Sequence, residues 1–149
     1  MASRTFIMLK PDAIEKNLES EILGFFKDHG IEVVRWDTVL VDEPLIMNHY
    51  QEVIEKLGLP DFPNRIRSYF VGKTVRIFEL ESKENNVVAK VRELIGTTDP
   101  SKAGPDTIRG KYSNDSMDLA KQEQRLVHNL IHASDSDENA YKEIKLWFK

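Results

Sequence analysis

The chain contains no cysteine. Disulfide bonds and thiolate metal sites are therefore excluded, and a reducing, cytoplasmic compartment is the natural expectation. The sequence also has no apolar run that approaches the length of a membrane span, and its first ten residues lack the layout of a secretory signal. We therefore expect a protein that has no membrane partner.

Basic residues are in the minority, because 21 Lys and Arg stand against 25 Asp and Glu, giving a net charge of −4. Nucleic-acid binding relies on many phosphate contacts by Lys and Arg, so this balance argues against a nucleic-acid partner. It does not prevent a few cations from gathering around one small anion.

Two familiar nucleotide-binding loops are missing, namely Gly-x-x-x-x-Gly-Lys-Ser/Thr and Gly-x-Gly-x-x-Gly. Any nucleotide site in this chain must therefore use another cradle. No linker, repeat or low-complexity tract interrupts the 149 residues, of which 40% are hydrophobic. We expect a single globular domain over residues 1–149.

Hydrophobic patterning predicts four strands, at 5–9, 31–41, 73–81 and 126–131. In the second of these, Val34, Trp36 and Leu40 share one alternating face. Helical spacing of apolar residues predicts helices at 18–29, 43–57, 62–70, 87–95 and 137–147. Asn86 is the expected N-cap of the fourth helix, and Ser134 and Ser136 are candidates for the last.

The predicted order is strand, helix, strand, helical hairpin, strand, helix, strand, helix. Without the hairpin and the last helix, the order βαββαβ remains. This is the ferredoxin-like α+β arrangement, a four-stranded antiparallel sheet with helices on one face. The fold hosts enzymes, metal carriers, regulatory domains and RNA binders, so it does not by itself define an activity.

The stretch from 97 to 110 is rich in turn-forming residues, and loops of this length in a compact domain are usually functional. Arg92 lies just before this loop and Arg109 near its far end, while Lys10 closes the first strand. Most Lys and Arg side chains are simply solvated surface charges. Cations that converge on one point, however, suit phosphoryl transfer, which depends on stabilising developing charge.

His132 is expected at the end of the last strand, where a neutral imidazole can attack an electrophile. Lone histidines are more often structural, and we interpret His29, His49 and His128 in that way. Glu143 lies in the helix that follows, and a helix that doubles back would bring its carboxylate to the imidazole. Taken alone, these residues predict an α+β domain with an anion site near His132.

The segment Asn-x-x-His-x-Ser-Asp-Ser, at Asn129 to Ser136, resembles the active-site signature of nucleoside diphosphate kinases. Other segments resemble the family's first strand, the two ends of its nucleotide loop and its closing helix; they are 5–12, 96–100, 107–110 and 142–148. The resemblance runs from Arg4 to Phe148, and the family's fold agrees with the strand order above.

The resemblance implies a ping-pong kinase in which His132 becomes a phosphohistidine. Glu143, helped by Ser134, would hold the other ring nitrogen. Lys10 and Asn129 would contact the sugar hydroxyls and the transferring phosphate.

Further nucleotide contacts are implied as well. Arg92, Thr98 and Arg109 would hold the phosphates, and Tyr50 would sit beside the histidine. An aromatic residue would stack on the base, which suits broad base specificity because every base has a π-face. Phe62 is the candidate for this role, although Asp61 aligns there in the alternative register of the divergent stretch 52–64.

The substrates implied are nucleoside di- and triphosphates. Mg²⁺ would arrive on their phosphates with no protein ligand of its own, as suits a metal that keeps its waters. A homo-oligomer is expected, with a hexamer favoured over a tetramer.

Three departures from the family pattern stand near these motifs: Asp106 and Asn17 each replace a usual glycine, and the stretch 111–128 is longer by roughly ten residues, as loops tolerate. They leave open the alternative that the chain is a nucleotide-binding or regulatory domain that has lost catalytic turnover. A ferredoxin-like RNA-binding module is the third alternative, and the acidic composition argues against it.

Overall fold

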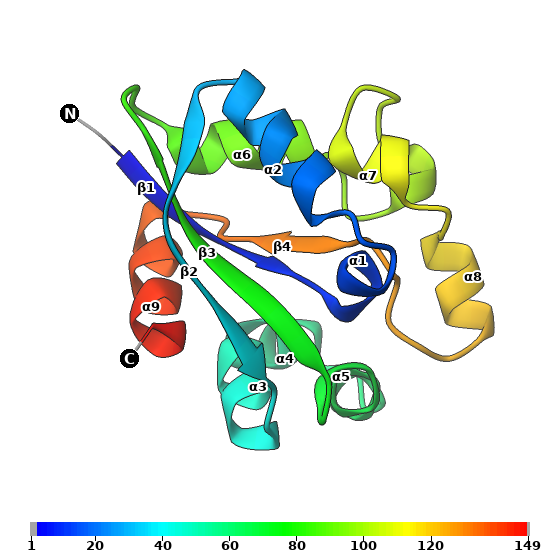
Figure 1. Cartoon of the computed structure of the whole chain (residues 1–149). Helices are drawn as coiled ribbons and strands as arrows, with labels where there is room; N and C mark the ends of the chain where they lie inside the picture. Colours follow the sequence, from blue (N-terminus) through cyan, green and yellow to red (C-terminus); the bar gives the residue numbers. More distant parts are fainter. Residues whose placement is uncertain (1–2, 149) are drawn as a thin grey trace.

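The structure, a computed structural model, describes residues 3 to 148, so the ends of the expected domain at residues 1, 2 and 149 lie outside it (Figure 1). Its sheet consists of β1 (Ser3–Leu9), β2 (Ile31–Leu40), β3 (Thr74–Ser82) and β4 (Ile131–Ala133). All pairings are antiparallel and the strand order is β2-β3-β1-β4. The ferredoxin-like α+β class expected from the sequence is confirmed.

Helices lie at every place where the sequence predicts one, and further short helical segments at 11–15, 100–102, 108–112 and 117–122 were not expected. The helices before β3 are α1 (Pro11–Glu15), α2 (Glu19–Asp28), α3 (Glu43–His49), α4 (Gln51–Leu57) and α5 (Phe62–Phe70). Those after β3 are α6 (Val87–Ile95), the 3₁₀ turn η1 (Pro100–Lys102), α7 (Ile108–Tyr112), α8 (Met117–Gln122) and α9 (Asp137–Trp147).

Helices cover both faces of the sheet (Figure 1). On β1, Ile7 and Leu9 belong to the core shared with α2 and α6. Phe6 and Met8 point the other way, into the core shared with α3, α5 and α9. Strand β1 is therefore a continuous apolar run, as a strand buried on both faces should be. The hairpin and last helix omitted from the βαββαβ pattern are the elements that cover the second face.

The expected strand at 126–131 is wrong in its limits, because β4 begins at Ile131 and His132 lies inside it. Leu130 has a φ of 75°, which breaks the extended backbone. The Ile131 N–H donates to the Asn129 carbonyl at 2.9 Å, closing a three-residue γ-turn. This turn is formed by a buried leucine in a conformation that L-residues rarely adopt, and such strain is often found at functional sites.

The helix expected over 43–57 is divided at Tyr50 into α3 and α4. Backbone hydrogen bonds still cross the division, since the Tyr50 N–H donates to Ile46 and the Tyr50 carbonyl accepts from Ile54. The division at Tyr50 therefore interrupts the helix without breaking its series of backbone hydrogen bonds.

Two expected caps are also wrong. Asn86 is left-handed and its side chain makes no capping hydrogen bond; Ser3 Oγ instead accepts from the Val87 N–H at 3.3 Å. Ser136 does cap α9, but Ser134 does not, because its hydroxyl is committed elsewhere, as described below.

Strand β2 is an edge strand with unusual exposure. Trp36 is 55% exposed and Leu40 69%, and a bulge between Val33 and Arg35 interrupts the pairing with β3. The face of β2 that carries Trp36 and Leu40 is therefore not buried in a single chain. Among residues 3–148, no helix combines the length and apolar character that crossing a membrane requires.

Candidate active site

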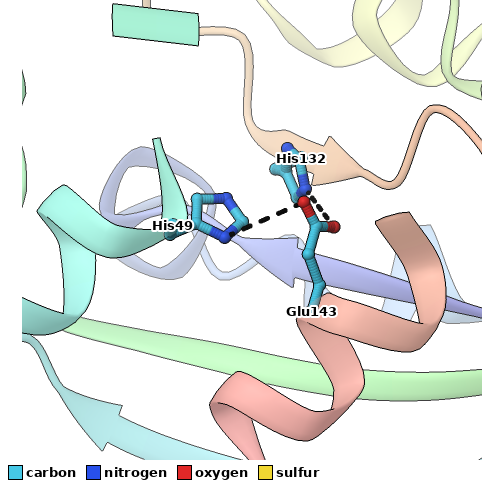
Figure 2. A group of neighbouring side chains, drawn as sticks. All are labelled: His49, His132 and Glu143. Carbon is cyan, nitrogen blue, oxygen red and sulfur yellow. Dashed lines mark hydrogen bonds and ion pairs between the residues drawn. The ribbon is translucent and has the colours of Figure 1, made fainter. Parts of the chain in front are cut away.

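His132 lies on β4 opposite Met8 of β1, and its imidazole meets the carboxylate of Glu143 from α9 (Figure 2). His132 Nε2 is 2.9 Å from Glu143 Oε1. The Ser134 hydroxyl donates to the same oxygen at 2.5 Å. The structure thus brings together the histidine, the glutamate and the serine that the sequence singled out.

These contacts define the state of the imidazole. Burial lowers the pKa of His132 to about 3, with further lowering by Lys10, Arg109 and Arg92. At pH 7 the ring is therefore neutral and carries one proton. Because the Glu143 carboxylate can only accept, that proton is on Nε2 and the lone pair is on Nδ1. Burial also raises the pKa of Glu143.

Lys10 is buried at the end of β1, where its Nζ donates to Asn129 Oδ1 at 2.8 Å. Burial and the charge of Arg109 lower the pKa of Lys10 to about 7. A bound anion would raise this lowered pKa and favour the charged ammonium form, so the buried amine favours anion binding.

Arg109 reaches across the γ-turn from α7. Its guanidinium donates to the carbonyls of Asn129 at 3.1 Å, Ile131 at 2.6 Å and Gly96 at 3.2 Å. An arginine has five N–H groups, so two remain for a ligand. Burial, then the charge of Arg92, lowers the Arg109 pKa to about 10. Arg109 therefore both shapes the site and brings charge to it.

The loop from 97 to 110 closes tightly on itself. A Cβ on Gly110 would lie 1.9 Å from the Gly104 carbonyl oxygen, and one on Gly96 would lie 2.6 Å from Thr107 Oγ1. The Thr98 carbonyl accepts from Asn129 Nδ2 at 3.0 Å, which ties the loop to the start of β4. Arg92 donates to the Ala133 carbonyl at 3.1 Å.

These groups line one cavity of about 1360 Å³. Of the ten site residues expected from the sequence, nine line it: Lys10, Tyr50, Phe62, Arg92, Thr98, Arg109, Asn129, His132 and Glu143. Ser134 lies behind Glu143. The cavity has ample room for a nucleotide, since typical ligand sites measure about 300–1,000 Å³.

Helices α4, α5, α8 and α9 all contribute residues to the cavity lining. Phe62 is half-buried at the first turn of α5, whereas Asp61 is exposed and pairs with Arg65 at 2.9 Å. Both line the cavity, so both registers considered from the sequence reach it. Asp106 is exposed and is not among the lining residues.

The stretch 111–128, expected from the sequence to be longer than in the family, contributes α8 to the cavity wall. It is held by Arg125, which donates to both Asp115 oxygens at 2.6 and 2.9 Å. Asp115 also accepts from the His128 N–H at 2.7 Å. These hydrogen bonds hold the stretch that carries α8 against the cavity.

His49 is the residue that sequence reasoning missed. Its ring centroid lies 4.5 Å from that of His132 in an edge-to-face contact, although the sequence had assigned it a plain structural role. Its adjacency to Tyr50 was the one signal that pointed to the site. His29 and His128 lie elsewhere, on the Phe25 carbonyl and the Tyr69 ring respectively.

The comparisons with known proteins agree with this geometry. The family model described as "Nucleoside diphosphate kinase" matches residues 3–149. A nucleoside diphosphate kinase of Methanosphaera stadtmanae is 38% identical over 148 residues, covering 99% of this chain and 87% of the relative. One from Sulfurisphaera tokodaii is 38% identical over 146 residues, covering 98% and 88%.

Solved structures give the same result. The transition-state mimic of the Borrelia burgdorferi nucleoside diphosphate kinase, with bound vanadate and ADP, has a TM-score of 0.92 at 30% identity and covers 99% of this chain and 88% of that one. The Pyrobaculum aerophilum enzyme has a TM-score of 0.88 at 31% identity, with coverage of 100% and 97%. The chain belongs to the nucleoside diphosphate kinase family and is a phosphotransferase.

Proposed function

We propose that the chain transfers the γ-phosphate of a nucleoside triphosphate to a nucleoside diphosphate through a phosphohistidine on Nδ1 of His132. The observation that carries this proposal is the hydrogen bond between His132 Nε2 and Glu143 Oε1. It places the only ring proton on Nε2 and leaves the Nδ1 lone pair available in the cavity.

In the first half-reaction, the Nδ1 lone pair of His132 attacks the γ-phosphorus. The bond from that phosphorus to the β–γ bridging oxygen breaks, and the departing diphosphate takes the electron pair. The imidazole gains positive charge, which Glu143 offsets at Nε2. Lys10, Arg92 and Arg109 face the negative charge on the phosphoryl oxygens, where such groups contribute most. The second half-reaction is the reverse, with a different diphosphate.

Magnesium is the cofactor that the family implies. The candidate metal-ligating cluster within residues 3–148 is His49, His132 and Glu143. Two imidazoles and one carboxylate do not suit Mg²⁺, which prefers oxygen ligands and retains waters. We therefore expect Mg²⁺ to bind through the nucleotide phosphates, with no direct protein ligand.

Broad base specificity is part of the proposal. Phe62 lines the cavity. Stacking on an aromatic ring does not depend on the identity of the base. Asp61 stands at the alternative position, where its pairing with Arg65 would leave Phe62 as the stacking residue.

A homo-oligomer, with a hexamer favoured over a tetramer, is also proposed. The exposed Trp36 and Leu40 on edge strand β2 support it, because large apolar side chains on an unpaired edge favour contact with another chain. A cytoplasmic location remains a prediction from the cysteine-free sequence.

The test is intact mass after mixing the protein with Mg-ATP, and again after adding a second diphosphate. We expect one acid-labile phosphoryl group that the diphosphate removes. The variant His132→Ala should gain none while keeping its fold. Nucleotide binding without phosphorylation of the native chain would instead favour the alternative of a binding domain that has lost turnover.

A further inference from the structure

His49 is a buried imidazole that the proposed reaction does not use. It ends α3, its side chain is 1% exposed, and it lies between His132 and Trp147. Its ring centroid is 4.5 Å from that of His132 and 5.4 Å from that of Trp147, both near-perpendicular. A second histidine packed against the candidate nucleophile requires an explanation.

The tautomer of His49 follows from one hydrogen bond. The indole Nε1 of Trp147 lies 3.0 Å from His49 Nδ1. An indole N–H can only donate, so Nδ1 must accept and cannot carry a proton. Burial lowers the His49 pKa to about 3, and a neutral ring must then hold its one proton on Nε2.

That Nε2–H has no hydrogen-bond partner among residues 3–148, although it is buried. A buried donor without a partner is unfavourable. The Nε2–H tautomer is therefore set by the Trp147 hydrogen bond at Nδ1 and not by a described protein partner at Nε2.

Glu143 is what this arrangement affects. Its Oε2 lies 4.0 Å from His49 Nδ1, beyond hydrogen-bond distance, while its Oε1 binds His132 (Figure 2). A proton on His49 Nδ1 would create an ion pair with Glu143 and draw the carboxylate from His132. The Trp147 N–H occupies the position where that proton would have to be.

We propose that His49 is a positioning residue for phosphoryl transfer: Trp147 locks it as a neutral Nε2–H tautomer, so that Glu143 keeps His132 as its only imidazole partner. This rests on the proposed function, in which His132 is the residue phosphorylated. The ring of His49 also packs edge-to-face against the His132 imidazole, a contact that would limit its rotation.

The titratable groups around His49 come from four segments. They are His132 on β4, Glu143 on α9, Lys10 after β1 and Tyr50 at the end of its own helix. Lys10 and a protonated His132 oppose a charge on His49, and Glu143 alone favours it. If the Trp147 hydrogen bond is removed, Glu143 is thus the group that would pair with a protonated His49.

The first experiment observes the lock directly, without any variant and without nucleotide. In the histidine-¹⁵N-labelled chain, two-bond ¹H–¹⁵N correlations between pH 5 and 9 distinguish a protonated ring nitrogen from an unprotonated one. We expect His49 to show a protonated Nε2 and an unprotonated Nδ1 throughout. A protonated Nδ1, or titration of His49 in this range, would overturn the proposal, whatever the activity.

The second experiment measures the rate of His132 phosphorylation by Mg-ATP in a single turnover, between pH 4 and pH 9. Trp147→Phe keeps an aromatic ring but removes the N–H, so we expect the pKa of His49 to rise by about 1–3 units as it pairs with Glu143. Phosphorylation should then lose rate at low pH, on an acidic limb that the native chain lacks.

The double variant Trp147→Phe/His49→Gln is the matched control, because glutamine does not titrate. The acidic limb should disappear in it, while any loss of rate from altered packing should persist at every pH. An acidic limb that survives in the double variant, or one absent from a folded Trp147→Phe, would refute the proposed lock. If the native chain itself is not phosphorylated, the proposed function fails, whereas the tautomer measurement still stands.

Discussion

Lys10 Nζ donates a hydrogen bond to Asn129 Oδ1 over 2.8 Å, joining the end of β1 to the residue that opens the γ-turn before β4. The two residues are 119 positions apart in sequence. Their contact brings a buried amine, with a pKa lowered to about 7, to the floor of the cavity. The charge on that amine should therefore control nucleotide capture near neutral pH.

This gives the first prediction. Because the pKa of Lys10 is lowered, the ammonium form predominates below about pH 7 and is lost as the pH rises through that value. We expect kcat/KM, which reports ionisations of the free enzyme, to fall between pH 6 and 9. In Lys10→Met this alkaline limb should vanish at a uniformly lower activity. A limb unchanged in the variant would assign it to another group.

Arg109 gives the second prediction. Arg109→Ala should lower kcat/KM by about 2–4 kcal/mol of transition-state stabilisation, the range for removal of one electrostatic donor. Arg109→Lys keeps the charge but cannot reach three carbonyls at once, so it should recover little. If the lysine variant is nearly native, charge alone accounts for Arg109 and its hold on the γ-turn is unimportant.

Gly110 gives the third prediction, which concerns the nucleotide loop. An added Cβ would lie 1.9 Å from the Gly104 carbonyl oxygen, so Gly110→Ala must displace the loop backbone. We expect a raised KM for nucleotides and a loss of about 1–3 kcal/mol in unfolding free energy. The control is Gly24→Ala in α2, where nothing lies within 4 Å and alanine should stabilise the helix by about 1 kcal/mol. Equal effects at the two positions would contradict the steric argument.

Sequence reasoning succeeded where the signal was local. Periodicity predicted the four strands and the longer helices, and short motifs pointed to nine of the residues that line the cavity. The limits of β4 were not, because a run of apolar residues looks like a strand whether or not Leu130 turns left-handed. Nothing in the local pattern marks that turn, which is held by residues distant in the sequence: Arg109 donates to the carbonyls of Asn129 and Ile131, and Asp12 accepts from the Leu130 N–H.

His49 shows the same limitation. Its tautomer depends on Trp147, 98 residues later in the chain, and its place beside His132 depends on how α3 and α9 pack on the sheet. No spacing rule connects these positions in a single sequence. The two caps were misassigned for a similar reason, since Ser134 is drawn to Glu143 and Ser3 displaces Asn86 only once the sheet has formed.

The stretch 111–128 gives the last prediction. The Asp115 side chain is only 8% exposed and binds both Arg125 and the His128 N–H. Asp115→Ala therefore leaves a backbone donor without its acceptor, at a cost of about 1–3 kcal/mol in unfolding free energy. Because this stretch carries α8 to the cavity wall, KM for nucleotides should rise several-fold while kcat changes little.

Glu123→Ala is the matched control, since Glu123 binds the same arginine at 2.7 Å but is 52% exposed. An exposed ion pair contributes at most about 1 kcal/mol, so this variant should bind nucleotides almost normally. Urea unfolding and initial-rate kinetics on the two variants check both expectations. If Asp115→Ala unfolds more easily but binds nucleotides as the native chain does, α8 adds stability without shaping the nucleotide site. If both KM and stability change, the stretch 111–128 helps to form that site.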